Sequence, residues 1–217
     1  MIVNEQVTTY LHSLERDNSA LLEEMRRFAK DNRVPIIRRE MESFLRFLLS
    51  VQQTEKILEI GTGIGYSAVF MAENAETVRE ILTIENYPPR IGLAKENLER
   101  YRKKAESRAE IRMLEADAAQ MVKTLEGEYD LIFLDGPKAQ YLPMLPDLKR
   151  LLRSGGILLA DNVLQDGELV MSRYVTQRRD RTIHERMREF VYQVTHDPEL
   201  TSTVLTVGDG VTLSRKQ

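Results

Sequence analysis

Short apolar runs alternate with amphipathic segments through the middle of this chain. Five runs have the composition of strands, and they are KILEIG from Lys56, EILTIE from Glu80, EIRMLEAD from Glu110, YDLIFLD from Tyr129 and GGILLAD from Gly155. Apolar runs of this length, bounded by glycine and polar residues, are typical of strands buried on both faces. Segments with helical spacing separate them, so the pattern predicts a parallel, doubly wound sheet.

The two ends of the chain follow different patterns. Residues 4–32 and 38–51 have helical spacing, and Pro35 interrupts them because the residue before a proline avoids the helical conformation. Near the other end a charged helix is expected over residues 180–196, and TSTVLTV and GVTLSRK then flank GDG as an antiparallel hairpin. The prediction is an α/β fold with a mostly parallel seven-stranded sheet. It forms a single domain, in which N-terminal helices (1–52) precede a core (53–217).

Composition narrows the possible chemistry. The chain has 217 residues, a formal net charge of −3, no cysteine and three histidines. Disulfides, thiolate ligands and cysteine nucleophiles are excluded, and three histidines leave little material for a zinc site or a catalytic triad. The first residues carry Glu5 and lack an apolar leader, and no run approaches the length of a membrane span. We therefore expect a cytoplasmic protein without membrane contacts.

Acidic residues stand at the ends of the predicted strands. In open α/β sheets, ligands bind beyond the carboxyl ends of the strands. The strand ends carry Glu59, Glu85, Asp117, Asp135, and Asp161 with Asn162. A buried carboxylate is costly unless a positive group pairs with it, so these positions predict a ligand site.

The first strand leads into the glycine loop GTGIGYS, with Gly61, Gly63 and Gly65. Such a loop lets the backbone approach a ligand and presents amides at a helix start, although a generic tight turn has the same composition. The nicotinamide fingerprint needs glycine where this chain has Tyr66. Glu85 could accept the two ribose hydroxyls of an adenosine, or it could be a solvated strand-end acid. Together these features favour an adenosine cofactor without a pyrophosphate, and Glu59 suits a positively charged amino group.

Three oxygen-bearing side chains suggest a metal. Asp135, Asp161 and Asn162 lie at neighbouring strand ends and would suit a hard cation such as magnesium. The alternative is structural, with a capping role for Asp161 or Asn162 and a turn role for Asp135. Lys138 would overlook the same site and favour a deprotonated substrate oxygen, although most lysines only face solvent.

These segments together resemble the class I S-adenosylmethionine-dependent O-methyltransferases of the cation-dependent catechol and caffeoyl-CoA type. The matching segments are VPII, EIGTGIGYS, TIE, EADA, FLDGPK, LLADNV and VGDGVTLSRK, and they span residues 34–216. Within that family the chain is most similar to the bacterial tRNA 5-hydroxyuridine methyltransferases. One departure is Pro137, since the catechol enzymes carry an aromatic residue just before the lysine. This departure puts stacking on a flat catechol in doubt.

The resemblance implies a Rossmann-like fold and a role for each matching residue. The residues implied to bind S-adenosylmethionine are Ile37, Glu59, Gly61, Gly65, Tyr66, Ser67, Glu85, Asp117, Ala118 and Asp135. Asp135, Asp161 and Asn162 would hold magnesium. Lys138 matches the catalytic lysine, and Asp135 would act beside it. The family is commonly dimeric, so a homodimer formed through the N-terminal helices is expected.

Arginines cluster in SRYVTQRRDRTIHERMREF, residues 172–190. Arginine suits phosphate because its guanidinium donates two parallel hydrogen bonds, and this favours tRNA as the partner. The candidate RNA-binding residues are Arg38, Arg173, Arg178, Arg179 and Arg181. Interspersed acids leave open that the cluster is only a solvated helix face. A small catechol or phenol is the alternative substrate, and a nucleotide-binding module without catalysis is the alternative from another class.

Overall fold

The computed structural model describes residues 3–104, 108–172, 174 and 177–217. The chain divides into two compact units. The N-terminal unit comprises Thr9–Ala118, and the C-terminal unit comprises Ala119–Gln217 together with Met1–Thr8. The strands of both units belong to one mixed, seven-stranded sheet with helices, as predicted.

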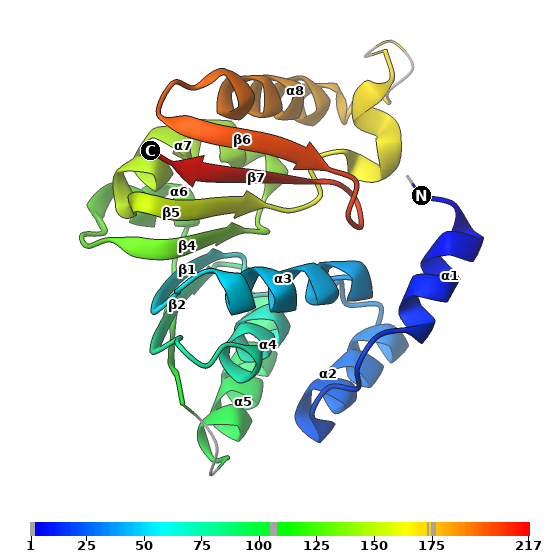
Figure 1. Cartoon of the computed structure of the whole chain (residues 1–217), viewed down its shortest axis with the longest axis vertical. Coiled ribbons are helices and arrows are strands. Elements are labelled where there is room, and N and C mark those ends of the chain that lie inside the picture. Colours follow the sequence, from blue (N-terminus) through cyan, green and yellow to red (C-terminus); the bar gives the residue numbers. More distant parts are fainter. Residues whose placement is uncertain (1–2, 105–107, 173, 175–176) are drawn as a thin grey trace. The chain divides into compact units, whose positions relative to one another are not determined.

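The N-terminal unit holds three parallel strands in the order β3-β2-β1. Its strands are β1 (Lys56–Ile60), β2 (Glu80–Glu85) and β3 (Glu110–Glu115). Its helices are α2 (Ala20–Asp31), α3 (Arg39–Val51), α4 (Tyr66–Asn74) and α5 (Pro88–Arg102), and α1 (Glu5–Ser13) crosses the division between the units. Helix α4 contacts α2, α3 and α5 as well as β2 and β3 (Figure 1). It therefore lies at the centre of this unit.

The C-terminal unit continues with four strands in the order β4-β5-β7-β6. Its strands are β4 (Tyr129–Leu134), β5 (Leu152–Ala160), β6 (Leu200–Leu205) and β7 (Val211–Lys216). Its helices are α6 (Ala118–Thr124), η1 (Lys138–Gln140), α7 (Tyr141–Leu151), η2 (Gln165–Val170) and α8 (Arg181–His196). β4 and β5 run parallel, whereas β7 pairs antiparallel with β5 and β6. Figure 1 shows α8 running alongside β6. The predicted C-terminal hairpin is confirmed.

Burial along the strands confirms their assignment to a core. Ile57, Leu58 and Ile60 of β1 and Ile132 and Phe133 of β4 are fully buried. Strands covered on both faces need apolar side chains at successive positions. The first residues beyond such strands are therefore the first at which polar side chains reach a site.

The helical spacing over residues 4–32 corresponds to two helices with a break between them. Helix α1 ends at Ser13 and α2 begins at Ala20. Ser19 caps α2, because its hydroxyl accepts a hydrogen bond from the Leu22 amide at 3.3 Å. The side chain of Asn18 is used in long-range hydrogen bonds to α3. Capping and tertiary contacts at these polar residues prevail over the helical spacing.

No helix in the described part of the chain is both long enough and apolar enough to cross a membrane.

Candidate active site

The glycine loop joins β1 to α4 in the N-terminal unit. Gly61, Gly63 and Gly65 have φ values of 101°, 57° and 83°, in the left-handed region that favours glycine. At Gly65 a Cβ atom would also lie 3.2 Å from Cδ2 of Leu98. The Gly65 amide donates to Thr62 O at 2.8 Å, which closes the turn. The loop thus needs glycine for its conformation, and at Gly65 also for close packing.

Glu85 ends β2 and is tied to this loop. Its Oε2 accepts a hydrogen bond from the Gly63 amide at 2.8 Å, and its Oε1 accepts from the amides of Asn86 and Tyr87 at 3.0 and 2.9 Å. The residue is only 8% exposed, so it is not a solvated strand-end acid. Its carboxylate holds the loop in place, and the ribose contact implied by the resemblance stays a prediction.

A second carboxylate lies beneath the loop. Glu59 is fully buried in β1, and its Oε2 accepts from the Thr83 hydroxyl at 2.5 Å. The hydroxyls of Thr83 and Thr62 lie 2.6 Å apart. These hydrogen-bonded side chains connect the loop residue Thr62 to the neighbouring strands β1 and β2.

The remaining cofactor candidates of this unit are partly or fully covered. Ile37, Ser67 and Ala118 are buried, and Asp117 is half-buried with Asn86 Nδ2 3.5 Å from its Oδ2. Parallel pairing of Ile60 with Ile84 and of Glu85 with Glu115 places the loop, Glu85 and the segment before Asp117 at one edge of the sheet. The side chain of Tyr66 is buried among α2 and α3, so any cofactor contact by this residue involves its backbone.

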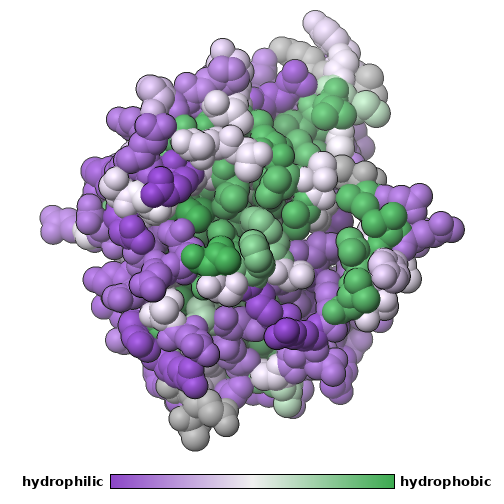
Figure 2. Space-filling model, in the orientation of Figure 1, coloured by the Kyte–Doolittle hydropathy of each residue, from purple (hydrophilic) through white to green (hydrophobic). Residues whose placement is uncertain are grey.

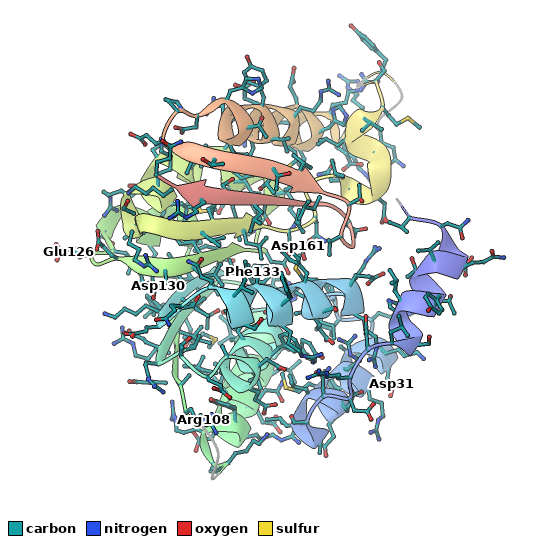
Figure 3. The ribbon with its side chains drawn as sticks, viewed as in Figure 1. Asp31, Arg108, Glu126, Asp130, Phe133 and Asp161 are labelled. Carbon is teal, nitrogen blue, oxygen red and sulfur yellow. The ribbon has the colours of Figure 1, made fainter. Side chains whose placement is uncertain are left out.

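The C-terminal unit brings the other candidates together. Leu134 of β4 pairs with Ala160 of β5, so Asp135 and Asp161 follow neighbouring strand ends, and Figure 3 shows Asp161 at the end of β5. Lys138 points its Nζ into this cluster. It lies 3.1 Å from Asp135 Oδ1, 2.7 Å from Asn162 Oδ1 and 3.3 Å from the Asp161 carbonyl oxygen. The lysine is therefore not a solvated surface residue.

Backbone geometry aims Asn162 at the lysine. Asn162 has a φ of 57°, which is uncommon for a residue other than glycine. Its amide donates to Asp161 Oδ1 at 2.6 Å, while its own Oδ1 accepts from Lys138. Neither residue caps a helix, and the structural alternative of a cap does not account for them.

Two residues of this cluster were not predicted. Tyr141 accepts a hydrogen bond from Lys138 Nζ at 2.8 Å and donates to the Leu134 carbonyl oxygen at 2.8 Å. Asp209, in the hairpin turn, has its Oδ2 3.4 Å from Asn162 Nδ2. The position of Tyr141 one helical turn after Lys138 was a usable signal, whereas Asp209 is distant in sequence from every other member.

Charge balance in the cluster is reflected in the pKa values. Burial raises the pKa of Asp161 to about 7, and the like charge of Asp135 adds to this while Lys138 opposes it. Burial lowers the pKa of Lys138, but Tyr141 and Asp135 outweigh that effect, so the pKa is raised overall. Lys138 is therefore an ammonium in this state. It pairs with the half-buried Asp135, and its charge favours the ionised form of the buried Asp161.

The cluster also suits a hard cation. Its side-chain ligands are carboxylate and amide oxygens, the donors that magnesium prefers, and they already surround one positive charge. No cluster of three or more His, Cys, Asp or Glu with metal-site geometry occurs among the described residues. A metal would therefore depend on Asn162 in addition to Asp135 and Asp161.

Of the predicted RNA contacts, two are exposed, two are half-buried and one lies outside the described part. Arg178 and Arg179 precede α8 and are exposed, and Arg181 is half-buried at its first turn. Arg38 precedes α3 in the N-terminal unit. Arg173 lies outside the described residues.

The chain has a Rossmann-like α/β sheet, a glycine loop after its first strand and acidic residues at the strand ends. These features are typical of the class I methyltransferases. Comparison with known sequences then identifies the family. The sequence model of the O-methyltransferase family matches residues 12–217, and the chain belongs to that family.

Individual relatives have related names. A catechol O-methyltransferase of Niastella koreensis is 33% identical over 129 residues, which are 58% of this chain and 58% of that protein. Caffeoyl-CoA O-methyltransferase 2 of Populus trichocarpa is 30% identical, over 80% of this chain and 71% of its own length. The SAH-bound structure of the Podospora anserina methyltransferase PaMTH1 has a TM-score of 0.85 and 28% identity, and the alignment covers 100% of this chain and 98% of that one.

Proposed function

We propose that this O-methyltransferase transfers the methyl group of S-adenosylmethionine to a hydroxyl oxygen with the help of magnesium. We further propose that the hydroxyl is that of 5-hydroxyuridine in the tRNA anticodon loop, which would become 5-methoxyuridine. The observation that carries the chemistry is the convergence of Lys138 with oxygens of Asp135, Asp161 and Asn162 at two strand ends. The SAH complex of PaMTH1 supports the choice of methyl donor.

The N-terminal unit would hold S-adenosylmethionine. The glycine loop would let the backbone approach the cofactor, and Glu85 would accept hydrogen bonds from the ribose hydroxyls. The buried Glu59 would favour the positively charged amino group, because unlike charges attract strongly away from water. When bound, the cofactor supplies a methyl group on a positively charged sulfur, and the leaving group is a neutral thioether.

Asp135, Asp161 and Asn162 would hold magnesium, which when bound supplies positive charge that stabilises the anion of the acceptor hydroxyl. Lys138 would assist removal of the hydroxyl proton. In the present state its Nζ is an ammonium that contacts Asp135, Tyr141 and Asn162. This role therefore requires Lys138 to release its own proton to solvent and to exchange partners before it accepts the proton of the hydroxyl. No covalent enzyme intermediate is needed.

The arginines of α8 support an RNA substrate. Arg186 donates to the Ala139 carbonyl oxygen at 3.2 Å, and Arg188 donates to the Leu169 carbonyl oxygen at 2.9 Å. Neither forms an ion pair with a described residue. Arg178 and Arg179 are exposed just before the same helix, and of these two Arg179 lies 3.4 Å from Asp180 Oδ2. Guanidinium groups that lack carboxylate partners remain available for phosphates.

A small catechol or phenol is the second candidate substrate. The observation in its favour is the similarity to enzymes named catechol and caffeoyl-CoA O-methyltransferases. Against it stands Pro137, which follows Gly136 where an aromatic residue would stack on a catechol ring.

A direct assay separates the two candidates. The purified protein would be supplied with methyl-labelled S-adenosylmethionine, magnesium and one of three acceptors: tRNA carrying 5-hydroxyuridine, the same tRNA without that hydroxyl, or catechol. Label in 5-methoxyuridine, identified by mass spectrometry of the nucleosides, supports the tRNA proposal. Preferred methylation of free catechol would replace it with the second candidate.

The Arg178→Ala, Arg179→Ala double variant tests the phosphate contacts. The logarithm of tRNA affinity should fall with the logarithm of salt concentration at about −0.7 per neutralised phosphate, and the double variant should flatten the slope by about 1. Affinity for the methyl donor should not change. Equal tRNA methylation by wild type and double variant would leave these arginines as a solvated helix face.

We also propose that the protein is a homodimer. Helix α1 carries Val7 and Leu11 one turn apart, and Leu14 directly follows its last residue; they are 46%, 45% and 62% exposed. Figure 2 shows a group of apolar residues, in green, at the surface on the side where Figure 1 draws α1. An exposed apolar helix face is typical of an interface. Light scattering of the wild-type protein should give a molar mass of two chains, and Leu11→Glu should lower the molar mass to that of one chain.

A further inference from the structure

A buried polar network lies behind the glycine loop in the N-terminal unit. The Tyr66 hydroxyl donates to Glu42 Oε1 at 2.5 Å and accepts from Arg26 Nη2 at 2.9 Å. Arg26 also pairs with Glu42, and its guanidinium lies 5.0 Å from the centroid of the Tyr66 ring. Tyr66 is 2% exposed and Glu42 is 3% exposed. Charged and hydrogen-bonding groups are therefore concentrated at a buried position between helices, where apolar side chains are more common.

The network extends to both ends of α4. Asn18 donates to Glu42 Oε2 at 3.0 Å and accepts from Arg46 at 2.9 Å. Arg46 also donates to Asn74 Oδ1 at 2.9 Å, at the last residue of α4. The N-terminal helices thus hold α4 at its first residue through Tyr66 and at its last through Asn74.

Tyr66 is placed to transmit this restraint to the loop. It directly follows Gly65 and is the first residue of α4, where backbone amides have no partner within the helix. No side chain caps this helix start, because its N-cap is Gly65. Burial raises the pKa of the Tyr66 hydroxyl, with Arg26 opposing, so the group remains a neutral donor to Glu42. The anchoring of the Tyr66 ring therefore fixes where the first amides of α4 lie.

We propose that Glu42 and Tyr66 are positioning residues for the methyl donor, which hold the glycine loop and the start of α4 in the binding-competent arrangement. The inference rests on the proposed use of S-adenosylmethionine by this unit. Neither side chain needs to touch the cofactor. Small displacements of a preorganised site are costly in binding, so loss of the anchor should be felt in cofactor affinity.

The competing explanation is that the network only stabilises the fold. Thr77 provides a matched control in the same unit, because its hydroxyl donates to the Thr54 carbonyl oxygen at 2.8 Å away from the glycine loop. Tyr66→Phe and Thr77→Val each remove one such hydroxyl. Glu42→Gln keeps the shape of the side chain but leaves Arg26 without its carboxylate partner.

Calorimetric titration with S-adenosylhomocysteine and thermal unfolding are measured for all variants. Tyr66→Phe should weaken binding by about three- to tenfold, the range of one net hydrogen bond, and Thr77→Val by less than about twofold. For Tyr66→Phe, the Michaelis constant for the methyl donor should rise, while kcat at saturating donor should stay unchanged. The Glu42→Gln, Tyr66→Phe double variant should bind no more weakly than the weaker single variant, because both act through one contact.

The outcomes distinguish the two proposals. If wild type does not bind S-adenosylhomocysteine, the proposed methyl donor is wrong. If wild type binds and Tyr66→Phe binds equally well while unfolding at lower temperature, the network is structural and the positioning role is overturned. Because Tyr66→Phe leaves the Arg26–Glu42 pair intact, this variant decides the matter even where Glu42→Gln fails to fold.

Discussion

The glycine loop of the N-terminal unit and the lysine cluster of the C-terminal unit are built in different ways. The loop is held mainly through its backbone. Gly61, Gly63 and Gly65 adopt left-handed φ angles, and Glu85 accepts a hydrogen bond from the Gly63 amide. In the cluster around Lys138, side-chain charges oppose one another, and three of the four hydrogen bonds of Lys138 Nζ go to side chains. The structure of the loop is therefore determined by backbone conformation, whereas that of the cluster is determined by attraction and repulsion between charged side chains.

This difference predicts how each region responds to change. A loop held by backbone geometry can be damaged by one added methyl group, because residues other than glycine are strained at left-handed φ angles. A balance of buried charges tolerates little loss of a member, because each charge left without its partner is costly in a low-dielectric site. Substitutions in the cluster should therefore act on turnover, and substitutions in the loop on cofactor affinity.

The largest effect is expected for Asp161→Ala. Removal of one of the two proposed carboxylate ligands should lower magnesium-dependent turnover by about 100-fold or more, because loss of a group that only hydrogen-bonds to a metal ligand already costs about 10- to 100-fold. The fold should persist, since burial already disfavours this charge. Initial rates at graded magnesium and circular dichroism test both points. Asp147→Ala is the control, because Asp147 pairs with Arg150 at 3.4 Å outside the cluster. Full wild-type activity in excess chelator would contradict the metal role.

The second-largest effect on turnover is expected for Lys138→Ala. If the lysine assists proton removal, kcat should fall by about 10²- to 10⁴-fold while affinity for the donor changes little. Lys123, exposed near the end of α6, gives the control variant Lys123→Ala in the same unit. Single-turnover rates with saturating donor and acceptor isolate the chemical step. An unchanged rate at every pH tested would show that Lys138 serves only to balance charge.

Gly65→Ala tests the other side of the comparison. A Cβ at this position combines a φ of 83° with a 3.2 Å approach to Leu98, so donor binding should weaken by about tenfold, as for strain of 1–2 kcal/mol. Gly127→Ala is the matched control, because Gly127 has a φ of 103° but nothing within 4 Å of its Cβ. Both variants should lose stability, and only Gly65→Ala should lose affinity for S-adenosylhomocysteine. Equal affinities would mean that the loop adapts its shape to the ligand.

The elements of the sheet were predictable because their signals are local. The run EILTIE is apolar where β2 is buried, and the predicted and observed strands both cover Glu80–Glu85. The acids at the strand ends were found for the same reason, since a polar residue after a buried run must lie at a sheet edge. Asp135 and Asp161 were expected to be neighbours, and pairing of Leu134 with Ala160 confirms this.

What escaped prediction depends on contacts between residues far apart in the chain. Tyr66 and Glu42 are separated by 24 positions, and nothing in GTGIGYS indicates that the tyrosine ring is buried against α3. Asp209 reaches Asn162 only because β7 pairs with β5 and places the hairpin turn beside the strand end. The break between α1 and α2 depends in part on Asn18, whose partners lie in α3. Tertiary partners, rather than local propensity, decide these features.

The smallest effect is expected for a charge pair that lies outside the cluster but in the same unit. Lys149 Nζ lies 2.5 Å from Asp197 Oδ2, with side chains 19% and 14% exposed. Burial raises the pKa of Asp197, but hydrogen bonds from Lys149 and the Glu199 amide outweigh it, so the pKa is lowered. A lowered carboxyl pKa adds stability above the unfolded pKa, and that stability is lost as pH falls through the folded value. Asp197→Asn should therefore cost about 1 kcal/mol near pH 7, and the deficit should shrink as pH falls below the carboxyl pKa of the unfolded chain. Urea unfolding across this range measures it, and kcat should not change. If the variant is still less stable than wild type at low pH, the lost stability comes from packing and not from the ion pair. If kcat falls, charge balance throughout the C-terminal unit, and not only around Lys138, governs turnover.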